Sequence, residues 1–208
     1  MTRPRVVAII PIGSIDGAKS RLGAVLDAEE RRDLALRLAR GTIRAAVATP
    51  GIDETLVVTP DDEVRDLAVR EGARPVRQRS RGLNDGLREA RDDAIAGGAD
   101  AILVLPIDIP HVSSDLIAPI VAKALDTSGP LVVIVPDRHD RGTNALLLAP
   151  PDVIDFCFGG DSKKAHIEAG SAVPGVDLVV MRGPLTLDID TPEDLLLAQM
   201  ETPGAVGG

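Results

Sequence analysis

Short apolar runs rich in β-branched residues recur along this chain, and in its first half they alternate with segments of helical periodicity. The runs lie at residues 5–12, 54–60, 101–107, 131–136, 143–149 and 177–181, and LTLDI at 185–189 follows them. Residues 28–48, 61–72, 83–98 and 113–125 have the spacing of amphipathic helices. Continuous apolar strands are typical of parallel sheets covered by helices on both faces. The pattern therefore predicts an α/β fold with a mostly parallel, mixed sheet flanked by helices.

A chain of 208 residues suffices for one domain with a substantial core and is short for two. Aromatic residues make up only 1%, with no Trp or Tyr, so Val, Leu, Ile and Ala must form the core. We expect one domain over residues 1–201 and a frayed tail over 202–208. After residue 136, two apolar runs flank DRHDRG without room for a helix, which predicts an antiparallel strand and a side lobe over the sheet.

The charge and the cysteine count limit the partners and the compartment. The formal net charge is −9, which argues against nucleic-acid binding because that function usually needs a basic face. The single cysteine, Cys157, excludes an internal disulfide and fits a reducing cytosol. No segment has the length of a membrane span or the pattern of a signal peptide. We therefore expect a cytoplasmic protein that binds neither nucleic acid nor membrane.

Ligands of open α/β sheets bind beyond the carboxyl ends of the strands, so candidate binding residues lie in the segments after the strands. After the first strand comes PIGSIDGAKSRL, with Gly13, Lys19 and Arg21 in a loop that leads towards a helix. Such a loop can bind an anion through backbone N–H groups and cationic side chains. It matches neither the GxxxxGK[ST] nor the GxGxxG pattern, so a solvated basic turn remains an equal interpretation.

A second basic segment, RQRSRGLNDGL, precedes the helix predicted at 83–98. Arg77, Arg79 and Arg81 are best interpreted as a solvated charge run, and their role stays open. Asn84 can either cap the helix or read the edge of a base with its amide.

Three aspartates come at or near the ends of apolar runs: Asp108 in VLPIDIPHV, and Asp188 and Asp190 in LTLDIDTPEDL. If LTLDI is a strand, Asp188 and Asp190 share one of its faces. Carboxylates from two strand ends can hold Mg²⁺, which binds a few carboxylates together with phosphate oxygens. A turn with Asp190 or Thr191 as a helix cap is the alternative, and the two interpretations are compatible.

Two later segments can hold a second anion. PDRHDRGTN contains Arg141 and Thr143, and FGGDSKKAH contains Gly159, Ser162 and Lys163 at a predicted helix start, where phosphate groups bind readily. His166 is more often a helix-face histidine than a ligand, and we assign it no role. Two anionic ligands beside a carboxylate-held cation are the arrangement for phosphoryl or nucleotidyl transfer.

The motifs IPIGSIDGAKSRL, GLNDGL, LPIDIP, PDR…GTNALLL, FGGDSKKAH and LDIDTPEDL occur in this order along nearly the whole chain. In this order they resemble the 2-phospholactate / phosphoenolpyruvate guanylyltransferases of deazaflavin coenzyme F-420 biosynthesis. The resemblance implies a Rossmann-like nucleotidyltransferase fold related to the GT-A enzymes. It also implies transfer of GMP from GTP to the phosphate of phosphoenolpyruvate or 2-phospholactate, with release of pyrophosphate.

Carried over by position, the resemblance assigns a role to each motif. It implies that Lys19 and Arg21 act as catalytic residues on the triphosphate, with Gly13 in the same loop and Asn84 near the guanosine. The remaining implied residues are Thr143, Gly159 and Ser162, together with Arg141 and Lys163, around the acid, and Asp108, Asp188 and Asp190 around Mg²⁺. A homodimer stays open.

The chain departs from the family pattern near the acceptor site. His139-Asp140-Arg141 replaces a stretch rich in glycine and threonine, Lys163 stands where an aromatic residue is common, and Gly13 stands where a lysine is frequent. The extra cations leave the acid open, and a more anionic acceptor such as 3-phosphoglycerate is an alternative.

Three other functions are compatible with some of these residues. A nucleotidyltransferase for a sugar phosphate or molybdopterin would keep the aspartates but prefer CTP or UTP. A haloacid-dehalogenase-type phosphatase is suggested by LDIDT, although its DxDxT motif belongs on the first strand of that fold. A non-catalytic nucleotide-binding module would need no metal site, so its properties would survive Asp188→Asn.

Overall fold

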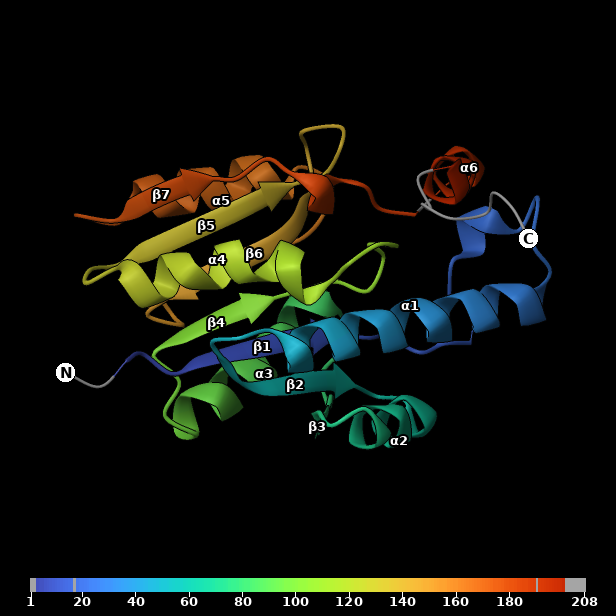
Figure 1. Cartoon of the computed structure of the whole chain (residues 1–208), viewed down its shortest axis with the longest axis horizontal. Helices are drawn as coiled ribbons and strands as arrows, with labels where there is room; N and C mark the ends of the chain where they lie inside the picture. The colour runs from blue at the N-terminus through green and yellow to red at the C-terminus, as the bar shows by residue number, and fades with distance from the viewer. Residues whose placement is uncertain (1–2, 17, 190, 201–208) are drawn as a thin grey trace.

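The structure is a computed structural model and describes residues 3–16, 18–189 and 191–200. In this part of the chain a seven-stranded sheet has the order β3-β2-β1-β4-β6-β5-β7 and lies between two layers of helices (Figure 1). The strands are β1 Val6–Pro11, β2 Ile52–Thr59, β3 Arg74–Arg77, β4 Ala101–Val104, β5 Leu131–Pro136, β6 Thr143–Ala149 and β7 Asp177–Val180. The helices are α1 Ala28–Ala48, α2 Asp62–Arg70, α3 Leu83–Ala96, α4 Ser114–Asp126, α5 Ser162–Ser171 and α6 Pro192–Met200, with 3₁₀ turns η1 Ser20–Leu22 and η2 Pro184–Thr186.

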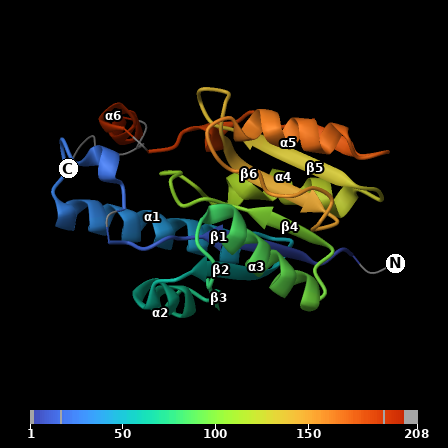
Figure 2. The ribbon, with the colours of Figure 1, turned by 180° about the vertical axis from the view of Figure 1, so that it is seen from behind.

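The core lies on both faces of the sheet because alternate residues of each strand point to opposite sides. Val6, Ala8 and Ile10 of β1 pack beneath α1, α2 and α4, whereas Val7 and Ile9 pack beneath α3 and α5. Figure 2 shows the second of these helical layers from behind. The predicted α/β class is therefore confirmed, and the aliphatic runs are buried because both faces are covered.

Helix α1 illustrates how local sequence sets an element. Asp27 caps it, with its carboxylate accepting from the Glu30 N–H at 2.9 Å while the Glu30 carboxylate accepts from the Asp27 N–H at 2.8 Å. This reciprocal capping box satisfies two N–H groups that a helix start leaves open. The predicted helix at 28–48 has the observed bounds.

Strand β6 runs antiparallel between β4 and β5, which confirms the predicted mixed sheet. The expected side lobe is wrong, since β5, β6 and β7 extend the same sheet. The reason is that β6 pairs with β4 over Ile102–Val104 as well as with β5. The β5–β6 hairpin is therefore part of the main sheet and not a separate lobe. Because of its direction, β6 begins with Thr143 opposite Pro136, at the edge where β1, β4 and β5 end.

The expected strand at 185–189 is also wrong. Its first residues form the turn η2, and the rest is irregular. Residues outside the segment supply the hydrogen bonds that a neighbouring strand would have made. The Asn144 side chain donates to the carbonyls of Leu185 and Thr186, both at 3.0 Å. The Ile189 N–H donates to the Asp108 carbonyl at 2.8 Å. Asp188 is therefore not on a strand face, and Asp190 lies outside the described residues.

The segment that contains Ile189 packs against the N-terminal half of α1. Ile189 is buried with Leu22, Leu34 and Leu38, and Leu195 of α6 packs against this cluster. Figures 1 and 2 show α6 beside η1 and the start of α1. In the described part, no helix is both long and apolar enough to span a membrane. The predicted tail, residues 202–208, lies outside the described residues.

Candidate active site

The predicted functional segments converge at one edge of the sheet. The loops after β1, β3 and β4 leave the carboxyl ends of parallel strands, and β6 begins at the same edge. This is the edge at which α/β proteins bind ligands.

Ile189 joins three of the predicted segments. Its carbonyl accepts from Lys19 Nζ at 2.6 Å, and its N–H donates to the Asp108 carbonyl at 2.8 Å. Lys19 itself has a φ of 54°, a left-handed conformation that is uncommon for a lysine and is found preferentially at functional sites. The first loop, the Asp108 loop and the Asp188 segment are thus held side by side, although they are far apart in sequence.

These residues fit a divalent cation by the chemistry of their donors. Asp108 and Asp188 bring carboxylate oxygens from two segments whose backbones are hydrogen-bonded to each other through Ile189. Hard cations prefer such oxygens. Among the described residues, which exclude Asp190, no group of three or more His, Cys, Asp or Glu is close enough to form a complete metal site. The predicted three-aspartate set therefore stays a prediction.

A cavity of about 410 Å³ lies beyond the ends of β1, β2 and β3. It is lined by Pro11, Ile12, Gly13, Ser14, Pro60, Gln78, Ser80, Arg81, Gly82 and Leu83. The cavity thus combines apolar walls with backbone, hydroxyl, amide and guanidinium donors, a combination suited to a small polar ligand. Gly13 and Arg81 line it directly, while Arg21 lies exposed on η1.

The arginine cluster beside this cavity divides into different roles. Arg81 lines the cavity, Arg77 pairs with Asp62 at 3.6 Å, and the backbone N–H of Arg79 donates to Glu89 at 2.8 Å. Glu89 also accepts from the Ser80 N–H at 2.8 Å, and these bonds lower the pKa of its carboxyl. The loop is therefore attached to α3. The side chains of Arg77, Arg79 and Arg81 are all exposed, as a solvated charge run requires, and Arg81 in addition lines the cavity.

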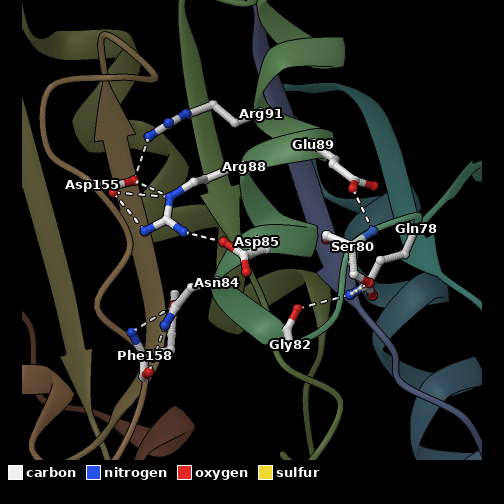
Figure 3. A network of polar contacts seen from close by, with 10 residues as sticks. All are labelled: Gln78, Ser80, Gly82, Asn84, Asp85, Arg88, Glu89, Arg91, Asp155 and Phe158. Carbon is white, nitrogen blue, oxygen red and sulfur yellow. Dashed lines mark hydrogen bonds and ion pairs between the residues drawn. The ribbon is translucent and has the colours of Figure 1, made fainter.

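Asn84 does not direct its whole amide to the cavity. Its Nδ2 donates to the Phe158 carbonyl at 3.0 Å and its Oδ1 accepts from the Phe158 N–H at 2.9 Å. Figure 3 shows α3 between the loop of Gln78 to Gly82 on one side and the segment of Asp155 to Phe158 on the other. Asn84 thus connects the wall of the cavity, through its neighbour Leu83, to the FGG segment.

The predicted acceptor residues lie at the start of β6 and of α5. Thr143 and Ser162 are buried, and Gly159, with a φ of 154°, forms the turn before α5. The Lys163 N–H donates to the Arg141 carbonyl at 3.0 Å, so the loop before β6 is attached to the first turn of α5. The structure therefore brings Thr143, Gly159 and Ser162 into one region.

The two cations predicted to face the acceptor have acidic partners. Lys163 Nζ lies 2.6 Å from Asp140, which also pairs with Arg182 at 2.8 Å, and Arg141 pairs with Asp161 at 2.8 Å. The ammonium of Lys163, followed by the guanidinium of Arg182, holds the pKa of the Asp140 carboxyl below its usual range. Much of the extra positive charge is therefore neutralised within the loop.

Sequence reasoning missed three buried polar residues whose contacts join the segments of the site. Asn144, next to Thr143, is buried and holds the η2 carbonyls that precede Asp188. Asp194 is buried, accepts from the N–H of Thr191 at 2.8 Å and from its hydroxyl at 2.9 Å, and pairs with Arg138. His166 is wholly buried between Thr143 and the Cys157 backbone. The polar character of Asn144 within an apolar strand was the available signal, since buried amides need partners.

The mixed sheet, with a cavity and two aspartate segments at one edge, is the fold of the nucleotide-diphospho-sugar transferases, as comparison with solved structures shows. A protein of Desulfovibrio desulfuricans named as a nucleotide-diphospho-sugar transferase aligns over 96% of this chain and 89% of its own, with a TM-score of 0.74 and 18% identity. Glucosyl-3-phosphoglycerate synthase of Mycobacterium tuberculosis, solved with Mn²⁺ and uridine diphosphate, aligns over 94% and 76%, with a TM-score of 0.62 and 12% identity.

Sequence relatives narrow the class. The family model described as "Guanylyl transferase CofC like" matches residues 6–205. A phosphoenolpyruvate guanylyltransferase of Sphaerobacter thermophilus is 42% identical over 91% of this chain and 90% of its own length. One of Rubrobacter xylanophilus is 41% identical over 97% and 96%. The chain belongs to this CofC-like guanylyl transferase family. The resemblance drawn from the motif order is confirmed, and guanylyl transfer in coenzyme F-420 biosynthesis is supported.

Proposed function

We propose that this enzyme transfers the guanylyl group of GTP to the phosphate of phosphoenolpyruvate and releases pyrophosphate. The observation that carries the proposal is the junction at Ile189, where Lys19 and the Asp108 loop meet the segment of Asp188. The names of the relatives support the acid, and the cavity beyond β1 to β3 supports a nucleotide donor.

In this proposal the nucleoside of GTP occupies the cavity lined by Gly13 and Arg81, and Lys19 and Arg21 contact the triphosphate. Lys19 is already fixed by its bond to the Ile189 carbonyl, which lowers the cost of ordering a long side chain. Their charge favours the transition state, in which negative charge shifts towards the leaving pyrophosphate. Asn84 acts from behind the cavity by holding Phe158, not by reading the base.

We assign Asp108, Asp188 and Asp190 to a divalent cation, for which Mg²⁺ is our proposal. The Mn²⁺ held by glucosyl-3-phosphoglycerate synthase supports a divalent ion in this fold. When bound, such an ion polarises the phosphoryl oxygens and neutralises their charge. The protein's part is to hold the two segments together, and the backbone hydrogen bond between Ile189 and Asp108 supports this.

The acid is held by Thr143, Gly159 and Ser162 in the proposal. Its phosphate is the nucleophile and is largely dianionic at pH 7, so the reaction needs no general base from the protein. Arg141 and Lys163 brace the loop through Asp161 and Asp140, and this pairing removes the reason to expect a more anionic acid such as 3-phosphoglycerate.

The test is pyrophosphate release by the purified protein with GTP and Mg²⁺, offering phosphoenolpyruvate, 2-phospholactate and 3-phosphoglycerate in turn. We expect the highest kcat/KM with phosphoenolpyruvate, and no release without an acid. A preference for CTP or UTP, or for 3-phosphoglycerate, would contradict the proposal. Replacing Mg²⁺ by Mn²⁺ or Ca²⁺ in the same assay tests the ion.

Two broader expectations complete the proposal. We place the enzyme in the cytoplasm, because its donor is GTP and its single cysteine needs no oxidising compartment. We also propose a homodimer, which light scattering on the purified protein tests directly.

A further inference from the structure

His166 occupies a position that the proposed reaction does not use. Its ring is fully buried, and its two nitrogens face different parts of the acceptor region. Nδ1 lies 3.1 Å from the Thr143 hydroxyl oxygen, and Nε2 accepts from the Cys157 backbone N–H at 3.0 Å. The ring also lies edge-on to Phe158, with centroids 5.0 Å apart at 72°. Three contacts therefore fix its position and orientation.

These partners determine where the imidazole proton lies. Because Nε2 accepts from a backbone N–H, it carries no proton, so the neutral ring carries its proton on Nδ1. A second proton on Nε2 would face the Cys157 N–H directly. Burial also lowers the pKa of His166 to about 4, so the ring is neutral at pH 7.

The Nδ1 proton in turn sets the direction of the Thr143 hydroxyl. Since Nδ1–H donates to Oγ1, the hydroxyl hydrogen of Thr143 must point elsewhere. Among the residues that the structure describes, no acceptor is found for that hydrogen, although Thr143 is only 6% exposed. A hydroxyl donates one hydrogen bond, so this hydrogen is available to an oxygen of the bound acid.

We propose that His166 is a positioning residue for the acid. It holds the Thr143 hydroxyl as an obligate donor towards an anionic oxygen of the acceptor and, through the Cys157 N–H, fixes the segment that leads to Gly159. This inference rests on the proposed acceptor site and deepens it, because it explains how a neutral side chain selects an acceptor-only oxygen such as a carboxylate or phosphate.

Two substitutions separate the two contacts of the ring. The side-chain amide of Asn reaches about as far as Nδ1, and that of Gln about as far as Nε2. His166→Asn can therefore still donate to Thr143 but leaves the Cys157 N–H without its acceptor. His166→Gln can still accept from Cys157 but loses the donor to Thr143.

The two variants should rank in opposite order in two measurements. His166→Gln should raise the KM for phosphoenolpyruvate about tenfold, as expected for loss of an aligned hydrogen bond to an anion, while His166→Asn stays within about threefold of wild type. His166→Asn should have the lower Tm, because it strands a backbone donor. The KM for GTP should change in neither variant. A purely structural role would move KM and Tm together.

A double-mutant cycle with Thr143→Val tests whether His166 acts through that hydroxyl. Thr143→Val should raise the KM for the acid about tenfold by itself, and adding His166→Gln should raise it no further. Additive effects, or equal KM values in the Asn and Gln variants, would overturn the inference. His139→Gln, at an exposed histidine on the nearby loop, is the matched control and should leave the KM for the acid unchanged.

The tautomer provides a readout that needs no activity. Only three histidines are present, so ¹⁵N–¹H correlation spectra of the imidazoles, compared with those of His166→Gln, assign the His166 ring. We expect the Nδ1–H form at pH 7, and the Nε2–H form would overturn the inference. Failure of the wild type to transfer guanylyl groups would instead overturn the proposed function, so the two outcomes are distinct.

Discussion

Asn144→Ala tests whether a side chain of the sheet holds in place the segment that contains Asp188. The Asn144 amide donates to the Leu185 and Thr186 carbonyls, both at 3.0 Å, and the residue is 5% exposed. Two hydrogen bonds contribute about 2 kcal/mol net, and leaving the carbonyl of buried Leu185 without this donor adds roughly 1 kcal/mol more. We therefore expect the free energy of unfolding to fall by about 3 kcal/mol and Tm by roughly 6–12 °C.

The effect on catalysis is more specific than the effect on stability. With η2 no longer attached to β6, the Asp188 carboxylate should lose its fixed distance to Asp108. The Mg²⁺ concentration for half-maximal activity should therefore rise about tenfold, a change typical of losing a group that orients a metal ligand. Pyrophosphate release measured across a Mg²⁺ titration, below the Tm of the variant, gives this value.

Asn84→Ala is the matched control, since it removes an amide with two backbone hydrogen bonds of 2.9 and 3.0 Å at a different place. The Asn84 side chain attaches α3 to Phe158, so its removal should raise the KM for the acid and leave the Mg²⁺ dependence of activity unchanged. If both variants shift the Mg²⁺ dependence equally, the assignment of Asn144 to the Asp188 segment is refuted and a general loss of stability explains the data.

Three further predictions follow from the charges. Burial lowers the pKa of His166 from 6.5 to about 4, so between these pH values the unfolded chain binds a proton there that the folded chain does not. About 3 kcal/mol of the free energy of unfolding, present above pH 6.5, should therefore be lost as the pH falls to 4. Denaturant titrations should show that the free energy of unfolding of His166→Gln depends less steeply on pH than that of the wild type. Lys163→Met should raise the KM for the acid by exposing the charge of Asp140, and the charge-balanced pair Lys163→Met with Asp140→Asn should restore much of it; no recovery in the pair would favour a direct contact of Lys163 with the acid. Asp188→Asn should lower kcat at least about 100-fold, and full turnover would exclude Asp188 as a metal ligand.

The fold was largely predictable because its signal is local. An apolar run with β-branched residues and an amphipathic helix each express their periodicity over a few residues, so their order predicts the α/β class. The pairing of β6 with both β4 and β5 is different, since it joins residues 102–104 to 146–148 and leaves no local trace. The expected side lobe failed for that reason.

The site was predictable in its positions and not in its contacts. The order of the motifs identified the segments that meet at the sheet edge, including Lys19 and Asp108. The partners of the side chains come from distant parts of the chain: Asn84 contacts residue 158 and Lys163 contacts residue 140. A polar side chain at a loop end has the same sequence appearance whether it contacts a ligand or a backbone group, so only the geometry separates the two.

The acids after the Asp188 segment illustrate this limit. Glu193 and Asp194 both stand in the first turn of α6, where acidic residues are favoured by the helix dipole alone. Glu193 is exposed, as that explanation requires. Asp194 is buried, its carboxylate accepts from the Thr191 N–H, and it pairs with Arg138, which belongs to the loop between β5 and β6. Through this pair the loop before Thr143 is attached to the helix that follows the proposed metal ligands. The acceptor side and the metal side of the site are thus connected by residues that contact neither substrate nor ion.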